Sequence, residues 1–275
     1  MPESDYIWPV ESIDNVRQAF LDFYESDDKC TYDSVDVAEV MVDDWWIKRF
    51  LIHERGNEDE ALNKLINCLK WRKETEIRSI EDNHFPEEIY RIGALFNYGR
   101  DQNGLPTIYI RVKMVKKLKE ISDLIKLYIA YTFYKVDKQS HGQGWGLIID
   151  FNGAGVQNTD LELARTIAFC IKTYFPSSLE YLICVDFPWI FKAFWNVIKS
   201  WIPADRKFSL LFLSRSQLKD TIDPDYLPAF LGGNCPKSPT EAPLGCPKFV
   251  DYCVTELGLS QKAAEKVFAQ YKPYL

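Results

Sequence analysis

Several features that mark common protein classes are scarce or missing in this sequence. The net charge is −7, with 33 Lys and Arg against 40 Asp and Glu, so the basic excess that favours nucleic-acid binding is absent. There are only three histidines, and none of the seven cysteines forms a C-x-x-C pair, so no metal-site spacing or full disulfide framework is present. We therefore expect no nucleic-acid partner, no metal and no cofactor.

Long apolar runs are also missing. No stretch approaches the ~18 consecutive apolar residues of a membrane-spanning helix. The first ten residues lack the basic start and apolar core of a signal peptide. Cys68, Cys170 and Cys184 lie within shorter apolar runs, as free buried thiols do in a reducing compartment. The sequence thus predicts a cytoplasmic protein whose contact with membranes is peripheral.

Aromatic residues, by contrast, are abundant. They make up 15% of the chain, with 8 Trp, 15 Tyr and 17 Phe, which exceeds what a core of this size needs. We expect some of these rings to line a cavity or a surface.

The periodicity of apolar residues divides the chain into three parts. Stripes at helical spacing, such as Ile13 to Tyr24 and Trp45 to Leu51, predict a helical N-terminal lobe over residues 1–90. Strand and helix patterns then alternate over residues 91–233, which predicts an α/β domain with a mainly parallel sheet. A Pro- and Gly-rich linker and two short helices follow over residues 234–275.

Within the α/β part, a hairpin begins near Phe96 and is followed by three buried strands that alternate with helices. The expected strands are Thr107–Val112, Trp145–Ile149, Tyr181–Val185 and Ser209–Leu213, and the expected helices are centred on 124–133, 160–174 and 189–201.

The segment Pro188–Ile202, called the gate segment below, is the most informative. As a helix it is apolar on nearly every side, with a thin polar stripe of Lys192, Asn196 and Lys199. Such a helix is either fully buried or lies between two apolar environments, and periodicity alone leaves both open. On the second interpretation it covers a cavity and touches a membrane through Trp189, Ile190, Phe191, Phe194, Trp195, Ile198, Trp201 and Ile202.

Aromatic insertion outweighs lysine attraction in this interpretation. Each aromatic ring removes ~150–250 Å² from water, so two rings contribute several kcal/mol at ~25 cal/mol per Å². A lysine near an anionic bilayer contributes ~1 kcal/mol. We expect membrane binding to resist salt and to be lost on Phe191→Asp with Trp195→Asp. The basic cluster is expected to be a solvated face, and its candidate headgroup or membrane contacts are Lys113, Lys116 and Lys117, with Arg55.

Six motifs, in order along the chain, resemble those of CRAL-TRIO lipid-transfer proteins. They are Asp43–Leu51 with Trp71-Arg72-Lys73-Glu74, Tyr98–Pro106, Leu147–Gly153, Tyr174-Phe175-Pro176, Asp186-Phe187-Pro188, and Leu227-Pro228 to Gly232-Gly233. Within the family, Asp186-Phe187-Pro188 and Trp189–Trp201 are most similar to the CRAL-TRIO domain of motile-sperm-domain-containing proteins. Full chains of those proteins continue into a major sperm protein module and a membrane anchor, so the likeness implies either a fragment of a longer parent chain fused to such a module or a stand-alone relative.

The resemblance implies a sheet that floors an apolar pocket, a mobile gate helix and no catalysis. The residues expected at the ligand are Ile108, Ile110, Leu147, Ile149, Ser177, Ser209 and Leu211. Where phosphatidylinositol-binding members carry a basic pair, a glutamate and a lysine, this sequence has Glu54 with Arg55, Ser177 and Ser209. These departures disfavour phosphatidylinositol and favour another lipid or a membrane-associating role.

Two other functions stay open. Gly153-Ala154-Gly155 after a buried strand could suggest a nucleotide-dependent α/β enzyme, but Asn158 stands where the third glycine of a dinucleotide loop is required. We expect Asp150 to cap the turn that follows its strand, and no residue to be catalytic. The third possibility is a scaffold whose pocket is vestigial.

Overall fold

The structure, a computed structural model, describes residues 10–202, 208–236, 238 and 240–275. Its contacts group the chain into two compact units. The first comprises the residues up to Ile80 together with Ile171–Ser178, and the second comprises Glu81–Cys170 and Leu179–Leu275. A short segment from the middle of the sequence therefore belongs to the N-terminal unit.

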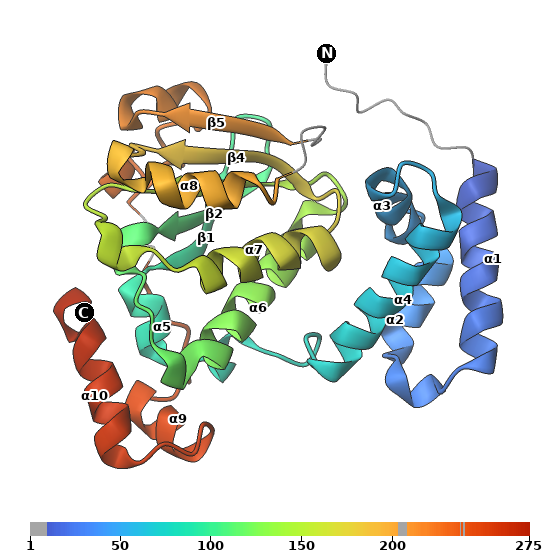
Figure 1. The fold of residues 1–275 in the computed structure, drawn as a ribbon, viewed down its shortest axis with the longest axis horizontal. Helices are drawn as coiled ribbons and strands as arrows, with labels where there is room; N and C mark the ends of the chain where they lie inside the picture. Colours follow the sequence, from blue (N-terminus) through green and yellow to red (C-terminus); the bar gives the residue numbers. More distant parts are fainter. Residues whose placement is uncertain (1–9, 203–207, 237, 239) are drawn as a thin grey trace. The chain divides into compact units, whose positions relative to one another are not determined.

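The first unit contains four helices. They are α1 (Val10–Ser26), α2 (Ser34–Val42), α3 (Trp45–His53) and α4 (Glu58–Glu74) (Figure 1). α4 begins after Asn57, whose side chain accepts a hydrogen bond from the Glu60 amide and so satisfies one open donor of the first turn. The helices predicted from periodicity in this region are confirmed.

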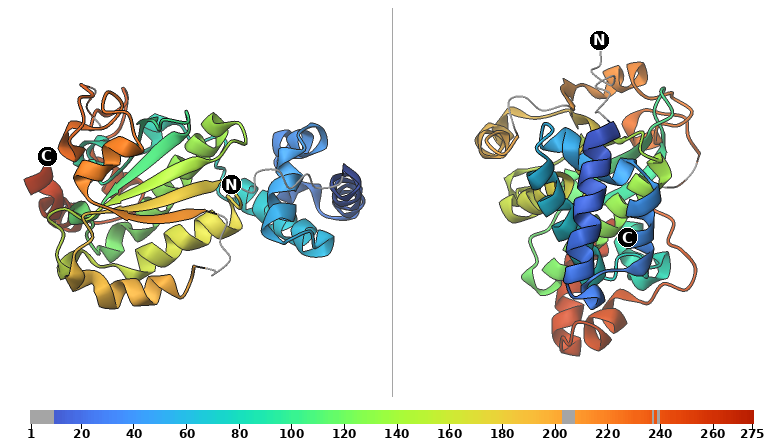
Figure 2. Two further views of the ribbon diagram at one scale, coloured as in Figure 1. Left: turned by 90° about the horizontal axis from the view of Figure 1, so that it is seen from above. Right: turned by 90° about the vertical axis from the view of Figure 1, so that its right-hand side faces the viewer.

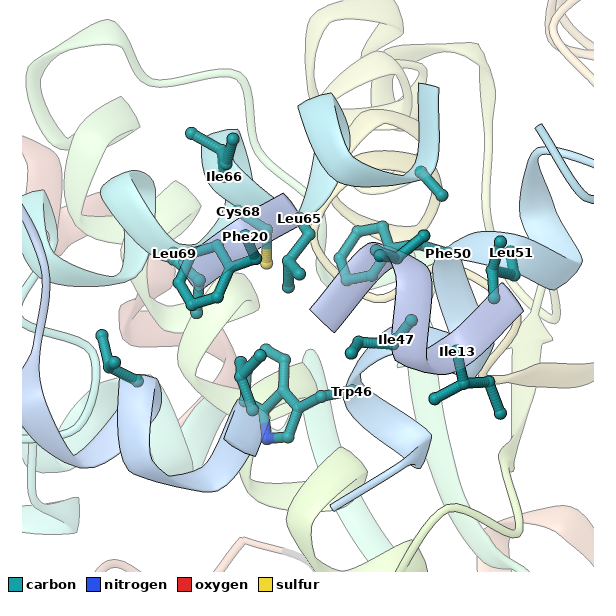
Figure 3. Close-up of a cluster of buried hydrophobic side chains, with 14 of the residues drawn as sticks. Ile13, Phe20, Trp46, Ile47, Phe50, Leu51, Leu65, Ile66, Cys68 and Leu69 are labelled. Carbon is teal, nitrogen blue, oxygen red and sulfur yellow. The ribbon is translucent and has the colours of Figure 1, made fainter. Parts of the chain in front are cut away.

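The core of the first unit is formed by apolar side chains from all four of these helices (Figure 3). They include Phe20, Trp46, Ile47, Phe50, Leu51, Leu65 and Leu69. A buried ion pair lies beside them, in which Asp36 accepts hydrogen bonds from Arg72, both at 2.8 Å, and from Arg78 at 2.6 Å. Such a pair is costly to break, because removing one partner leaves an uncompensated buried charge.

The segment Ile171–Ser178 completes the first unit. The ring of Tyr174 stacks on Trp71, with ring centroids 3.7 Å apart and planes 6° from parallel. Arg49 donates a hydrogen bond to the Pro176 carbonyl at 3.2 Å and another to the Ser178 hydroxyl at 2.7 Å. The predicted Tyr-Phe-Pro corner is thus held by aromatic stacking and by a buried guanidinium.

The second unit is built on a five-stranded sheet with the strand order β1-β2-β3-β4-β5. β1 and β2 form an antiparallel hairpin, and all later neighbours are parallel, which confirms the predicted mainly parallel sheet. The strands are β1 (Leu95–Arg100), β2 (Pro106–Arg111), β3 (Trp145–Asp150), β4 (Leu179–Val185) and β5 (Ser209–Leu213).

Helices connect the parallel strands and extend the unit at both ends. They are α5 (Glu87–Ile92), α6 (Ser122–Ser140), α7 (Leu161–Thr173), α8 (Lys192–Lys199), α9 (Phe249–Thr255) and α10 (Gln261–Tyr271). The carboxylate of Glu88 in α5 accepts a hydrogen bond from the Phe249 amide at the start of α9, so the C-terminal helices pack within this unit.

The two faces of the sheet are covered differently. Because each parallel strand is followed by its neighbour through a right-handed crossover, α6, α7 and α8 all fall on one face, called the helix-covered face below. Figure 2 shows α7 and α8 running along that side of the strands. The opposite face is closed by the chain after β5, through Leu218, Ile222, Leu227 and Leu231.

Candidate functional site

Four of the expected ligand residues share the helix-covered face. The parallel register pairs Ile108 with Leu147 and Ile110 with Ile149, and alternation along the strands points all four to one side. The same register extends this side to Leu182, Cys184, Leu210 and Phe212. Burial raises the pKa of the Cys184 thiol to about 12, so the surface beneath the helices is apolar and uncharged.

The three crossover helices seal this face to different extents. α6 has 19 residues and ten of them are buried, whereas the 13 residues of α7 include one buried residue, Cys170. None of the eight residues of α8 is buried. The side of α7 opposite its exposed residues carries Ala164, Ile167 and Ala168, and all three stay half-buried. On the sheet beneath them, Leu147, Leu182 and Cys184 are buried, whereas Ile149 and Leu210 are half-buried and Phe212 is 47% exposed.

The gate segment forms a 3₁₀ turn (Trp189–Phe191) that leads into α8. Phe191 is fully buried and belongs to a cluster with Val112, Phe151 and Cys184. Its ring lies 5.3 Å from that of Phe151. Aromatic packing therefore anchors the amino end of the segment to the sheet.

The remaining inward side chains of the gate segment are half-buried. Trp195 packs edge-on against Phe212, with ring centroids 5.1 Å apart. Trp201 lies beneath the guanidinium of Arg165 from α7, at 5.3 Å from the ring centroid. The other half-buried members are Phe194, Ile198 and Ile202.

The exposed side of the gate segment differs from the expectation. Trp189 is 86% exposed, Ile190 43% and Val197 41%, whereas Phe191 and Trp195 face the protein. The expectation that Phe191 touches a membrane is therefore wrong, because the chain enters α8 through a 3₁₀ turn that directs Phe191 onto Phe151. The half-buried Trp195 packs on Phe212, and its contact with a membrane stays a prediction. The segment is not enclosed on all sides, so the fully buried alternative is also wrong.

A polar bridge ties the start of the gate segment to the ends of β3 and β5. Asp186 adopts a left-handed conformation with φ +49°, and its carboxylate accepts a hydrogen bond from the Arg215 amide at 3.0 Å. The Arg215 guanidinium lies 3.4 Å from the Asp186 carboxylate and 3.5 Å from that of Asp150. Burial raises the pKa of the Asp150 carboxyl, although the neighbouring Arg215 and Arg111 act in the opposite direction.

Three of the expected ligand residues do not join the four on the helix-covered face. Ser209 pairs with Tyr181 and Leu211 with Ile183, so both point to the opposite face of the sheet. Ser177 and the candidate headgroup contact Arg55 belong to the first unit. Ser209 and Leu211 therefore do not share a face with the other four, because the sequence alone does not fix the face to which a strand residue points.

The basic candidates Lys113, Lys116 and Lys117 lie in the connection between β2 and α6. Sequence reasoning missed Phe151, Phe187, Phe212 and Arg215, which hold the gate segment. Of these four residues, only Phe187 could have been found from the sequence, because it lies inside the Asp-Phe-Pro motif.

Asp150 and Asn158, in the region whose sequence suggested an enzyme, form hydrogen bonds that stabilise the loops after β3. The Asp150 carboxylate accepts a hydrogen bond from the Asn152 amide at 3.0 Å, which confirms its predicted role in the turn. The Asn158 side chain accepts from the Gly155 amide and donates to the carbonyls of Lys113 and Val115. Within the described ranges, no group of three or more His, Cys, Asp or Glu side chains is placed to hold a metal ion. No described helix is long and apolar enough to span a bilayer.

Known proteins resemble this chain in sequence and in fold. The CRAL-TRIO domain-containing protein C365.01 of Schizosaccharomyces pombe is 20% identical over 82% of this chain and 64% of its own length. The Sec14 cytosolic factor of the same species is 27% identical over 74% of this chain and 78% of its own. The phosphatidylinositol/phosphatidylcholine transfer protein SFH9 of Arabidopsis thaliana is 25% identical over 74% of this chain and 39% of its own.

The chain thus spans less than two thirds of the first and third of these relatives. In structure, it matches the crystal structure of Sfh5 with a TM-score of 0.57 at 13% identity, over 94% of this chain and 96% of that one. The model of the CRAL/TRIO domain family matches residues 90–233, which include the whole sheet and the gate segment. Since this match covers more than half of the residues of the chain, the chain belongs to the CRAL/TRIO domain family.

Proposed function

We propose that the second unit binds a lipid between the helix-covered face and the helices α7 and α8, and exchanges it with membranes at the gate segment. The observation that carries this proposal is the contrast between α6, which is packed into the core, and α7 with α8, which are not. Partly uncovered apolar side chains cost about 25 cal/mol per Å², and an acyl chain placed against them would remove that cost.

The relatives support a lipid as the ligand. One of them is named as a phosphatidylinositol/phosphatidylcholine transfer protein, and its similarity to this chain extends over 227 residues. The side chains that line the proposed binding space, Leu147, Ile149, Cys184 and Leu210, are all uncharged, as binding of hydrocarbon requires. Transfer also requires contact with a bilayer, for which Trp189 and Ile190 are the exposed apolar side chains.

Lipid loading of two β5 variants tests the proposal. Leu210 and Leu211 are neighbours on opposite faces, so Leu210→Trp fills the proposed binding space and Leu211→Trp is its matched control. Native mass spectrometry after incubation with phosphatidylcholine vesicles should show one lipid on the wild type and on Leu211→Trp, and loss of lipid from Leu210→Trp. A wild type that takes up no lipid, or equal uptake by the two variants, would reject the proposal and favour a scaffold with a vestigial pocket.

The identity of the headgroup is a separate part of the proposal. A lipid other than phosphatidylinositol stays a prediction from the sequence comparison alone, because Ser209 points away from the proposed binding space and Ser177 belongs to the first unit. Stoichiometric phosphatidylinositol in the purified protein would overturn this part alone.

The likeness to motile-sperm-domain-containing proteins stays a prediction. It rests on Asp186-Phe187-Pro188 and the aromatic gate segment. It predicts either a longer endogenous protein that also carries a major sperm protein module or a stand-alone relative, and the size detected on an immunoblot with an antibody to the second unit would distinguish the two. No catalytic step is assigned to any residue of the site. A thermal-shift screen in which nucleotides, but not lipids, stabilise the protein would favour the enzyme instead.

A further inference from the structure

Four lysines gather at the carboxyl edge of the sheet, in the connection between β2 and α6, whose one acidic residue is Glu120. The basic loop, residues 112–119, joins β2 to α6 and carries Lys113, Lys116, Lys117 and Lys119. Lys117 and Lys119 are exposed. Since the whole chain has a net charge of −7, this loop is a local exception to its charge.

These lysines are not neutralised by ion pairs. In the part of the chain that the structure describes, none of the four pairs with a carboxylate, whereas Lys126 pairs with Glu162 at 3.0 Å and Lys135 with Asp82 at 2.5 Å. The pKa of the Glu162 carboxyl is lowered first by its hydrogen bond from Lys126 and also by the fields of Lys117 and Lys119. The positive field of the loop therefore reaches the first turn of α7.

Hydrogen bonds fix the basic loop beside exposed apolar side chains. The Asn158 side chain donates to the carbonyls of Lys113 and Val115, both at 3.0 Å, and so joins the loop to the connection between β3 and α7. In that connection Val156 is 56% exposed, and Leu161 at the start of α7 is 43% exposed.

The gate segment lies at the same edge. Val112, at the start of the basic loop, packs in one cluster with Phe151 and Phe191. The connections after β2, β3 and β4 all leave the sheet at this end, as Figure 1 shows at the heads of the arrows. The four lysines and the exposed side chains of Val156, Leu161, Trp189 and Ile190 therefore share one edge, called the docking edge below.

We propose that the docking edge binds an anionic lipid bilayer, with the lysines at the headgroups and the apolar side chains in the interface. Charge complementarity selects this partner, because a chain of net charge −7 is repelled by an anionic surface unless it presents this edge. The lysines then orient the protein so that the gate segment meets the membrane. Insertion provides salt-resistant affinity, and the lysines add a salt-sensitive preference for anionic lipid.

The proposal rests on the proposed function and is tested by vesicle binding. Vesicles of phosphatidylcholine with and without phosphatidylserine would be cosedimented with wild type, Lys117→Gln/Lys119→Gln and Trp189→Ser/Ile190→Ser. Each lysine is worth at most about fivefold in partitioning, so the lysine variant should lose up to about thirtyfold on phosphatidylserine vesicles and nothing on phosphatidylcholine. The Trp189→Ser/Ile190→Ser variant should bind both more weakly.

The matched control removes two lysines at the opposite edge of the sheet. Lys138 is near the start of β3, and the carbonyl of Lys219 accepts a hydrogen bond from Gln102 in the β1–β2 turn. Lys138→Gln/Lys219→Gln has the same charge change and should keep the wild-type preference. High salt should abolish the preference for phosphatidylserine and leave binding to phosphatidylcholine.

Equal wild-type binding to the two kinds of vesicle would overturn the inference, as would equal losses in the lysine variant and its control. The lipid-loading assay separates this failure from failure of the proposed function. Loading without anionic preference would reject the docking edge alone, and anionic preference without loading would reject the proposed function alone.

Discussion

Phe191 and Trp189 lie two residues apart in one 3₁₀ turn but in opposite environments. Phe191 is enclosed by Val112, Phe151 and Cys184, whereas the indole of Trp189 faces outward. A buried ring contributes through packing in the folded protein, and an exposed ring contributes little until another apolar surface covers it. The same turn thus contains one residue that stabilises the fold, Phe191, and one that is available to contact another apolar surface, Trp189.

Substitution of these two residues should separate stability from membrane binding. We expect Phe191→Ala to lower the free energy of unfolding by about 3–5 kcal/mol, because it leaves a cavity in a packed cluster. Trp189→Ala should change it by less than about 0.5 kcal/mol. Urea unfolding followed by circular dichroism measures both. Equal destabilisation by the two changes would contradict the environments described here.

Asp150 is the buried carboxyl at the site whose pKa is raised. Its pKa in the folded protein lies above the unfolded value, so the folded state binds the proton more tightly than the unfolded state does. Its contribution to stability is therefore full below the unfolded pKa and is lost as the pH rises through the folded pKa.

The side chain of an Asp150→Asn variant carries no charge, so the variant should not lose stability as the pH rises. Its amide oxygen can still accept the hydrogen bond from the Asn152 amide. We expect the variant to be at least as stable as the wild type at neutral pH, with the difference narrowing as the pH falls into the range where carboxyls titrate. Thermal unfolding over a pH series is the measurement. A clear loss of stability at neutral pH would mean that the ion pair with Arg215 outweighs desolvation.

At the scale of elements, the crossover helices differ in how they are fixed. α6 packs into the sheet through residues such as Tyr128, Phe133 and Val136, all buried. α7 and α8 meet the sheet through half-buried side chains, so fewer apolar contacts oppose their local opening.

Amide hydrogen exchange should report this difference. In lipid-free protein, the amides of α7 and α8 should exchange faster than those of α6. Added phospholipid should slow exchange in α7 and α8 and leave α9 and α10 unchanged. Uniform protection of all the helices, or no effect of lipid on α7 and α8, would contradict the proposed binding region.

Most elements could be predicted from the sequence because periodicity directly reports which residues are removed from water. The strand Ser209–Leu213 has the bounds that its pattern predicts, and the helix after Asn57 begins where its cap indicates. The orientation of the gate segment could not be predicted, because a helix apolar on two sides has no pattern that distinguishes inside from outside. For the same reason the faces of Ser209 and Leu211 required the register with β4.

At the scale of the whole molecule, the chain leaves the α/β unit and returns to it. Ile171–Ser178 comprises the end of α7 and the connection to β4, but it belongs to the first unit. Phe175 is buried there, and its ring lies edge-on to Trp71 at 6.2 Å. The α/β unit is therefore not a self-contained stretch of sequence.

A fragment beginning at Glu81 should fold poorly compared with the whole chain. It keeps Tyr174, Phe175 and Ser178 but loses Arg49 and Trp71, their partners in the first unit. We expect lower solubility and stronger binding of a hydrophobic dye. A fragment in which Tyr174 and Phe175 are changed to serine should be more soluble, and equal behaviour of fragment and whole chain would contradict this assignment.

The aromatic cluster around Phe191 has a mechanical consequence. It fixes the gate segment at its amino end and, through Phe194 and Trp195, near its middle, whereas Trp201 at the other end contacts Arg165, an attraction worth about 0.5–1 kcal/mol at an exposed site. We therefore expect the gate segment to open first at its carboxyl end. Hydrocarbon would then enter beside Trp201, and Arg165 would act as the latch.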